Sequence, residues 1–282
     1  MRIDFTKMHG LGNDFIVFES PTAAAALTPA QWRALADRHR GIGFDQALVI
    51  EPPRRAGTEV YYRIFNADGL EVEQCGNGAR CIAELLRLKG RANGGQVAMD
   101  SPGGLIQARL PGNGIVAVDM GVPDFLPAAS HFIPQANGEA GAAGPTYALR
   151  VDGEVLHFGV VSMGNPHAVL RVPDVDTAPV ARLGPLLERH PAFAQRVNVG
   201  FMQIVARDHI RLRVFERGVG ETQACGTGAC GAVAVGRRDG LLDSQVRVSL
   251  PGGDLSVRWP GAGAALWLEG PAAVSFRGQF EI

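Results

Sequence analysis

The feature that most constrains this chain is an internal repeat, because short motifs recur in the same order about half a chain apart. Cys75-Gly76-Asn77-Gly78-Ala79 is followed 150 residues later by Cys225-Gly226-Thr227-Gly228-Ala229. Three further pairs match at separations of 150 to 157 residues: Gly12-Asn13 with Gly164-Asn165, Gly43-Phe44-Asp45-Gln46 with Gly200-Phe201-Met202-Gln203, and Arg63-Ile64-Phe65-Asn66 with Arg213-Val214-Phe215-Glu216. Four matches in one order predict two related halves.

The 282 residues are enough for two domains. We expect an N-terminal domain over residues 1–125 that carries Cys75 and is completed by a C-terminal strand at 271–282. The second domain, over residues 126–270, carries Cys225. The Ala- and Gly-rich segment 135–145 is expected to form a surface loop near the domain boundary.

Helices are predicted in both halves. Thr28-Pro29-Ala30-Gln31 has the pattern of a capping box with proline at the first helical position, so a helix should run to about Arg40 and end at Gly41. A comparable helix is expected around Val180–His190, interrupted near Gly184-Pro185. Alternating apolar residues predict half-buried strands at Val60–Asn66, Ile115–Met120, Leu212–Glu216, Val246–Leu250, Leu255–Trp259 and Leu266–Glu269.

A proline-free run follows each Cys-Gly-x-Gly motif, at Ala79–Lys89 and at Ala229–Arg237, and each run predicts a helix. The second run is apolar and small-sided all round, which is typical of a helix enclosed by strands. We therefore predict an α+β fold with two pseudo-symmetric strand-rich domains, each a β-barrel-like sheet wrapped around a central helix.

Composition argues against several classes of protein. The net charge of -1 gives no basic field for nucleic acid or an anionic membrane, and no apolar stretch approaches the roughly 20 residues of a spanning helix. We therefore expect a soluble cytoplasmic protein. The four cysteines lack the short spacings of structural zinc sites, although a mixed zinc site assembled from distant residues stays an alternative. Within the predicted helices, Cys81 and Cys230 are interpreted as small buried hydrophobes.

The repeated cysteines suggest a specific chemistry. A helix N-terminus carries unpaired N–H groups and partial positive charge, which bind a carboxylate and favour a thiolate. Glycines at 76, 78, 226 and 228 let the backbone approach a ligand closely. If Cys75 and Cys225 lie on opposite faces of one α-carbon, one can remove its proton while the other returns a proton from behind. Two alternatives involve no catalysis by these cysteines: they form a Cys75–Cys225 disulfide, or the duplication preserved only a core.

The chain resembles the diaminopimelate epimerase family along essentially its whole length. The resemblance lies in Met8-His9-Gly10-Leu11-Gly12-Asn13-Asp14-Phe15, Phe65-Asn66-Ala67-Asp68-Gly69, Gln74-Cys75-Gly76-Asn77-Gly78-Ala79-Arg80-Cys81, Gly164-Asn165-Pro166-His167, Asn198-Val199-Gly200, Glu216-Arg217-Gly218 and Ala224-Cys225-Gly226-Thr227-Gly228.

This resemblance implies that the chain converts LL-diaminopimelate to the meso form in lysine biosynthesis, as a cytoplasmic homodimer and without pyridoxal phosphate or metal. It implies that Cys75 and Cys225 transfer the proton, and that His167 and Glu216 assist. The residues that it implies for substrate binding are Asn13, Gln46, Asn66, Gly76, Asn77, Asn165, Asn198, Glu216, Arg217, Gly226 and Thr227. Phe276 stands where relatives carry a tyrosine at the dimer contact.

Two alternatives stay open at this point. Another two-cysteine racemase, acting on proline or hydroxyproline, would have no second charged end for Asn66, Asn198 and Arg217 to bind. A non-catalytic amino-acid-binding module would close on its ligand without exchanging the α-proton.

Overall fold

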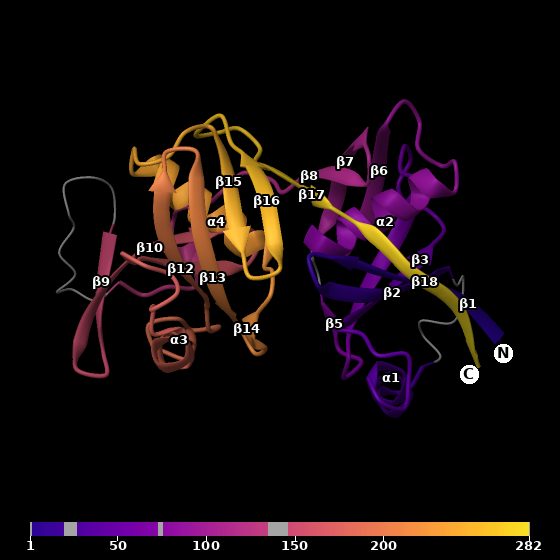
Figure 1. Ribbon diagram of the computed structural model, residues 1–282, viewed down its shortest axis with the longest axis horizontal. Coiled ribbons are helices and arrows are strands. Elements are labelled where there is room, and N and C mark those ends of the chain that lie inside the picture. Colours follow the sequence, from indigo (N-terminus) through magenta and orange to yellow (C-terminus); the bar gives the residue numbers. More distant parts are fainter. Residues whose placement is uncertain (1, 20–26, 73–75, 135–145, 282) are drawn as a thin grey trace. The chain divides into compact units, whose positions relative to one another are not determined.

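The computed structural model describes residues 2–19, 27–72, 76–134 and 146–281, which fall into two compact units (Figure 1). Unit 1 comprises Met1–Asp119 and Glu269–Ile282, and unit 2 comprises Met120–Leu268. Cys75 and the expected loop at 135–145 lie outside the described residues.

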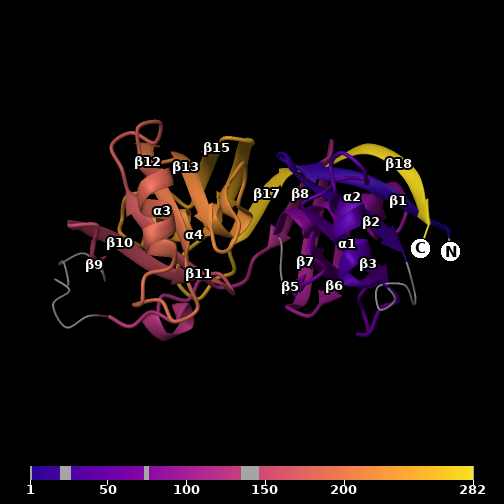
Figure 2. The same ribbon diagram turned by 90° about the horizontal axis from the view of Figure 1, so that it is seen from below.

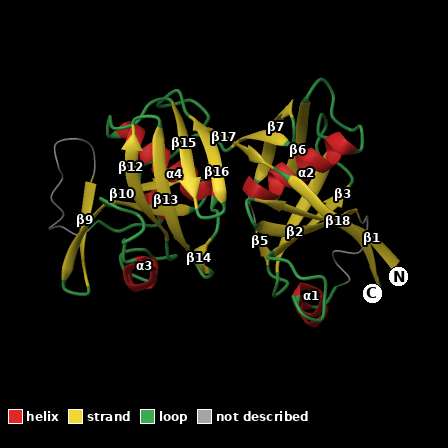
Figure 3. Ribbon diagram, in the orientation of Figure 1, coloured by secondary structure: helices red, strands yellow, loops and turns green. Residues whose placement is uncertain are grey.

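Both units consist mainly of strands (Figure 3). The elements of unit 1 are β1 (Arg2–Gly10), β2 (Asn13–Glu19), α1 (Pro29–Ala36), β3 (Gln46–Glu51), β4 (Val60–Asn66), β5 (Glu71–Val72), α2 (Gly76–Leu88), β6 (Gln96–Ser101), β7 (Gly104–Gly112), β8 (Ile115–Asp119) and β18 (Ala273–Glu281). Those of unit 2 are η1 (Pro127–Ser130), β9 (Thr146–Val151), β10 (Glu154–Ser162), β11 (Pro166–Arg171), α3 (Val180–Glu188), β12 (Asn198–Ala206), β13 (His209–Glu216), β14 (Gly220–Thr222), α4 (Gly226–Arg238), β15 (Gln245–Leu250) and β16 (Gly253–Arg258). Strand β17 (Trp267–Pro271) carries the chain from unit 2 back to unit 1.

The two units repeat one succession of strand pairings. In unit 1, β18, β1 and β2 pair antiparallel, β2 and β3 parallel, β3 and β4 antiparallel, β4 and β6 parallel, and β6 and β7 antiparallel. In unit 2 the same succession runs through β9, β10, β11, β12, β13, β15 and β16. The C-terminal strand β18 thus has the place in unit 1 that β9 has in unit 2.

A central helix lies among the strands of each unit, as Figures 1 and 2 show for α4 in unit 2. Helix α2 contacts β1, β2, β7 and β8, and α4 contacts β10, β11, β12, β13 and β16. Residues Gly76–Leu86 and Gly226–Gly236 are all buried. The predicted architecture of strands around a central helix is confirmed, and both helices begin three residues earlier than predicted, at the first glycine of the motif.

Small residues let α4 lie close to its strands. A methyl group on Gly159 of β10 would come within 2.5 Å of Val235, and one on Gly231 would come within 3.2 Å of Val161 and 3.4 Å of His167. Real side-chain carbons almost never approach to 2.5 Å, and the distances at Gly231 are tighter than most real contacts, so glycine at these places sets the distance between helix and sheet. Residues at the start of α4 are thereby held at fixed positions relative to β10 and β11.

We expect Gly236→Ala to destabilise unit 2 by up to about 2 kcal/mol, because overpacking costs about 1–3 kcal/mol. A methyl group at Gly236 would lie 2.4 Å from Cδ1 and 2.9 Å from Cγ of buried Leu242, so the leucine must move. The roughly 1 kcal/mol that alanine gains over glycine in a helix offsets part of this cost. Thermal unfolding of the variant beside the wild type checks the prediction. An unchanged melting temperature would show that Leu242 repacks freely.

Two helix predictions need correction. The capping box at Thr28 is present, but α1 ends at Ala36 instead of Arg40. It ends early because the Asp37 carboxylate accepts hydrogen bonds from the amides of His39 and Arg40, at 2.8 and 3.0 Å, which turns the chain away from the helix. The expected interruption near Gly184-Pro185 is wrong, since α3 runs continuously from Val180 to Glu188 with Pro185 inside it.

One of the four repeat matches is wrong in register. Gln46 pairs with Phe15 across the parallel strands β2 and β3, and Asn198 pairs with His167 across β11 and β12. Phe15 and His167 each lie two residues after the asparagine of the repeated Gly-Asn. Asn198, and not Gln203, is therefore the structural equivalent of Gln46.

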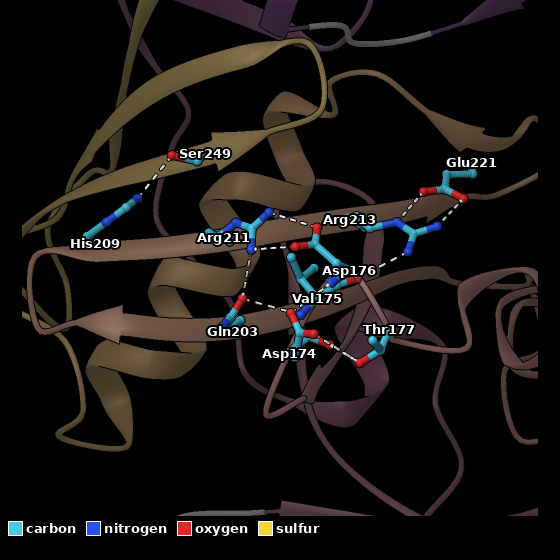
Figure 4. Close-up of polar contacts among 10 residues, drawn as sticks. All are labelled: Asp174, Val175, Asp176, Thr177, Gln203, His209, Arg211, Arg213, Glu221 and Ser249. Atoms are coloured by element: carbon cyan, nitrogen blue, oxygen red, sulfur yellow. Dashed lines mark hydrogen bonds and ion pairs between the residues drawn. The ribbon is translucent and has the colours of Figure 1, made fainter.

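Figure 4 shows that Gln203 belongs to a different group of contacts, where its Oε1 accepts from Arg211 NH1 at 3.4 Å. The same view contains an ion pair that the repeat does conserve. Arg213 donates to both carboxylate oxygens of Glu221, at 2.6 and 2.9 Å. In unit 1, Arg63 donates in the same way to Glu71, at 2.7 Å in both bonds. The two arginines are 150 residues apart, which supports the match of β4 with β13.

Candidate active site

Cys225 is the N-cap residue of α4, with an extended backbone (φ -115°, ψ 109°) and only 4% of its surface exposed. Its Sγ accepts a hydrogen bond from the amide of Gly228 at 3.4 Å and lies 3.6 Å from Oγ1 of Thr227. A methyl group on Gly228 would lie 3.2 Å from the sulfur. The glycine of the motif therefore allows this approach between the amide and the sulfur.

Burial raises the pKa of the Cys225 thiol well above its usual value, and the nearby carboxylate of Glu216 raises it further. The hydrogen bonds from Thr227 and Gly228 favour the thiolate but are outweighed. The start of the helix therefore favours a thiolate, but burial and Glu216 outweigh this effect at Cys225. At neutral pH this cysteine is a thiol and can give a proton.

We expect Glu216→Gln to lower the pKa of Cys225, because the substitution removes a negative charge that opposes the thiolate. The measurement is the pH dependence of alkylation at Cys225 by iodoacetamide, followed by mass spectrometry of its peptide. The midpoint should move to lower pH. Glu221→Gln is the matched control, since Glu221 pairs with Arg213, and its midpoint should stay at the wild-type value.

A chain of polar contacts links Cys225 to His167. Asn165 Nδ2 donates to Thr227 Oγ1 at 3.3 Å, and Asn165 Oδ1 lies 2.9 Å from Nε2 of His167. Burial, together with the positive charge of Arg217, lowers the pKa of His167 to about 3. The imidazole is therefore neutral at physiological pH and donates its Nε2–H to Asn165. His167 thus orients the amide of Asn165.

The side chain of Asn198 links β11, the strand that carries His167, to the turn between β13 and β14. Its Nδ2 donates to the carbonyl of Pro166 at 2.9 Å, and its Oδ1 accepts from the amide of Arg217 at 3.0 Å. The side chain is 3% exposed, so both bonds form away from solvent. The amide of Asn198 is thereby fixed in one orientation.

Glu216 and Arg217 lie at the same turn. Thr222 donates a short hydrogen bond to the Glu216 carboxylate, and Arg217 Nη1 donates to the carbonyl of Gln195 at 3.2 Å. Unit 2 therefore brings the predicted residues together around the start of α4: Asn165, His167, Asn198, Glu216, Arg217, Cys225, Gly226 and Thr227. Thr222 was not predicted, although comparing Glu221-Thr222 with Glu71-Val72 along the repeat would have revealed a polar difference.

The predicted residues of unit 1 form a matching arrangement. Asn77 Nδ2 donates to Asn13 Oδ1 at 3.1 Å, so the equivalent pair is bonded in both units, although in unit 2 the donor is Asn165 and the acceptor is Thr227. Gln46 Nε2 donates to Asn66 Oδ1 at 2.9 Å. Buried Gly76 begins α2 as Gly226 begins α4.

Charged residues that were not predicted hold Asn13 in place. Asp45 accepts from Asn13 Nδ2 at 2.9 Å, while Arg38 donates to both Asp45 and Asp14, at 2.7 Å each. Burial alone would raise the pKa of Asp14, but the hydrogen bonds of Arg38 and Lys7 lower it to about 2. Asp14 is therefore ionised across the physiological range. Unit 2 has Pro166 at the equivalent position, so this support differs between the halves.

Two features of the described residues bear on the alternatives of a zinc site and a membrane protein. Among the residues that the structure describes, no three His, Cys, Asp or Glu side chains are placed to hold one metal ion. Within the same residues, no helix has the length and apolar character needed to span a membrane.

Comparison with known proteins gives matches over the whole chain. The family model described as diaminopimelate epimerase matches residues 5–126 and 159–274. A diaminopimelate epimerase of Chromobacterium violaceum is 52% identical over 282 residues, which cover 100% of both chains.

Solved structures with low sequence identity share the fold. A predicted epimerase of Pseudomonas aeruginosa matches with a TM-score of 0.69 at 18% identity, covering 100% of both chains. A hydroxyproline epimerase of Agrobacterium vitis, solved with bound trans-4-hydroxy-L-proline, matches with a TM-score of 0.68 at 17% identity, covering 99% of this chain and 92% of that one. A phenazine biosynthesis protein of the PhzF family from Enterococcus faecalis matches with a TM-score of 0.67 at 14% identity over 100% of both chains.

Proposed function

The chain belongs to the diaminopimelate epimerase family, and from this premise we propose that Cys75 and Cys225 are the acid/base pair of its reaction. The protein is a cofactor-independent diaminopimelate epimerase that acts in lysine biosynthesis. The full-length identity of 52% carries this assignment. We further propose that units 1 and 2 are the two domains of the enzyme, each contributing one of the cysteines.

The proton transfer uses one thiolate and one thiol. The raised pKa of Cys225 makes it the thiol, and therefore the acid, of the resting enzyme. Asn66, which is neutral, is the repeat equivalent of Glu216. Because the repeat has this neutral residue where unit 2 has a carboxylate, we assign Cys75 as the resting thiolate and base.

In one direction, the Cys75 thiolate takes the α-proton and the electron pair left on carbon delocalises into the substrate carboxylate. The Cys225 thiol then gives its proton to the opposite face, which inverts the centre and leaves Cys75 as thiol and Cys225 as thiolate. The reverse direction exchanges the two roles. Such a pair titrates as a coupled unit, so the limits of a bell-shaped rate profile belong to both sulfurs.

The helix starts stabilise the charge that develops on the carboxylate. Amides at Gly226 and Thr227 of α4 and at Gly76 and Asn77 of α2 are at helix N-termini, where N–H groups and the helix dipole favour an anion. The amide of Gly228 is already bonded to the Cys225 sulfur. The amides that precede it in α4 are therefore assigned to the substrate.

The remaining polar residues hold the distant end of diaminopimelate, which has its own ammonium and carboxylate. Arg217 pairs with the carboxylate, since a guanidinium matches a carboxylate in charge and geometry. Glu216 and the amide oxygens of Asn13, Gln46, Asn66 and Asn198 accept from ammonium groups. Because His167 is neutral and bonded to Asn165, its role in this scheme is to position Asn165 near Thr227.

The substrate is tested by incubating the protein with LL-diaminopimelate in deuterium oxide. We expect the meso form to appear with deuterium at the inverted α-carbon, and we expect proline and hydroxyproline to be neither inverted nor labelled. Turnover of an imino acid in preference to diaminopimelate would contradict the substrate assignment. Binding of diaminopimelate without labelling would contradict the enzymatic reading.

We also propose that the enzyme works as a cytoplasmic homodimer, as its family resemblance implies. Phe276, which stands where relatives carry a tyrosine at the dimer contact, lies on β18 with 49% of its surface exposed. Light scattering after size-exclusion chromatography should give twice the 29.8 kDa of one chain. Phe276→Glu should shift this mass towards the monomer.

A further inference from the structure

Glu188, at the end of α3, is a buried acidic residue that contacts the turn bearing Arg217. Its side chain is 2% exposed, and a carboxylate buried to this degree is costly unless hydrogen bonds compensate it. Oε1 accepts from the amide of Gly218 at 3.1 Å, and Oε2 accepts from Nε of Arg189 at 3.0 Å. Arg196 lies 3.6 Å away, and both arginine side chains are more than half exposed.

Two consecutive amides of the turn after β13 are held from outside the turn. The amide of Arg217 donates to Asn198 Oδ1 at 3.0 Å, and the amide of Gly218 donates to Glu188 Oε1 at 3.1 Å. The backbone carbonyl of Glu188 also accepts from Val197, the residue before Asn198, at 3.1 Å. Glu188 is therefore bonded both to the turn that bears Arg217 and to the start of the strand that bears Asn198.

The equivalent turn of unit 1 is held differently. Its backbone bond is the same, since Gly69 donates to the carbonyl of Asn66 at 2.9 Å as Val219 donates to Glu216 at 3.2 Å. There, Asp68 within the turn accepts from the amide of Leu70 at 2.9 Å, and a methyl group on Gly69 would come within 2.7 Å of Trp32. The first helix of unit 1 thus meets its turn through an apolar ring, and the matching helix of unit 2 meets its turn through a carboxylate.

We propose that Glu188 is a positioning residue that fixes the Glu216–Gly220 turn so that Arg217 meets the distal carboxylate of the substrate. Gly218 has a φ of +75°. Because glycine has no side chain, this residue could adopt many other backbone conformations if its amide were released. Positioning within about 1 Å can change a rate or an affinity by about a hundredfold. This proposal rests on the proposed role of Arg217 in binding diaminopimelate.

Two substitutions separate the hydrogen bond from the charge. Glu188→Gln keeps an oxygen at the same reach for the Gly218 amide but removes the charge that pairs with Arg189 and Arg196. Glu188→Asp keeps the charge but is one methylene shorter and withdraws the oxygen from the amide. We expect Glu188→Asp to raise KM for diaminopimelate about tenfold or more, with kcat within about threefold of the wild type. Glu188→Gln should keep both constants within about threefold.

A double-mutant cycle identifies the route of the effect. In an Arg217→Ala background, Glu188→Asp should cause no further loss of kcat/KM, because the group that it positions is absent. Arg189→Ala is the control, since it removes an exposed partner of Glu188 and should leave KM unchanged.

The outcomes distinguish the role proposed for Glu188 from the role proposed for Arg217. If Arg217→Ala itself leaves KM unchanged, the assignment of Arg217 fails and the role of Glu188 fails with it. If Arg217→Ala raises KM but Glu188→Asp does not, only the role of Glu188 is overturned. If Glu188→Gln raises KM and Glu188→Asp does not, the proposal is also overturned. Glu188 would then act through its charge on Arg189 and Arg196 and not through its hydrogen bond to Gly218.

Discussion

Replacement of Cys225 by alanine is expected to lower kcat for epimerisation by about a thousandfold or more, because the inverted centre then receives no proton from its acid. Cys75→Ala should cause a loss of similar size by removing the base. Isotope exchange in deuterium oxide gives the sharper result. Each variant keeps one sulfur, which faces the α-hydrogen of only one epimer. Each should therefore exchange that epimer without inverting it, and the two variants should label opposite epimers.

The control for these variants is Cys230→Ala. Cys230 is fully buried in α4, five residues after Cys225, and outside the proposed chemistry. Its substitution should change stability slightly and leave kcat within about twofold. Substantial epimerisation by Cys225→Ala, or identical labelling patterns from both single variants, would overturn the two-sulfur mechanism.

Arg217→Ala is expected to lower kcat/KM for diaminopimelate by about a hundred- to a thousandfold, mostly through KM. The loss arises because the distal carboxylate of the substrate would be desolvated without a cationic partner. Arg217→Lys should recover only part of it, since an ammonium cannot form the paired hydrogen bonds of a guanidinium. Steady-state kinetics over a range of substrate concentrations measures both constants.

A second arginine provides the matched comparison. Arg211 lies on the same β-hairpin but donates to Asp176, at 2.9 and 2.7 Å, in the surface network of Figure 4. Arg211→Ala should leave kcat/KM within about twofold. Normal kinetics in Arg217→Ala would remove the basis for assigning the distal carboxylate to this residue.

The repeat predicted most of the architecture because it contains glycines, which are used where the backbone must turn or approach another group closely. The two Cys-Gly-x-Gly motifs located both central helices, and the capping box located the start of α1 at the correct residue. Strands such as β3 and β11 were missed because their central residues are buried on both faces. Their sequences therefore lack the alternation by which a half-buried strand is recognised.

The error in aligning Gln46 with Gln203 has a similar physical origin. The match rested on a shared Gly-Phe-x-Gln string at a separation of 157 residues, whereas the other matches lie at 150 to 152. Strand register shows that Asn198 is the true equivalent. Gln46 and Asn198 are both side-chain amides at the same place in the two sheets but differ in length and in hydrogen-bond partners, so a match of residue types alone gave the wrong equivalence.

The predicted site residues of unit 2 lie together, but their electrostatics could not be read from the sequence. A cysteine at a helix start is usually activated, and here burial and Glu216 reverse the direction of the pKa change. Glu188 was missed for another reason. It precedes an arginine in a helix end, a pattern typical of a solvated ion pair, and only the fold shows that its carboxylate is buried against Gly218.

The difference between Glu216 and Asn66 affects the orientation in which the enzyme binds a substrate whose two ends carry the same groups. Diaminopimelate carries the same pair of groups at both ends, so a fully symmetric set of acceptors would bind it in two opposite orientations of equal energy. One carboxylate, set against one amide, attracts an ammonium group to one side and makes the orientations unequal. Arg217, which has Ala67 as its repeat equivalent, adds a second difference, so a duplicated scaffold can distinguish the two ends of its ligand through charges that only one half carries.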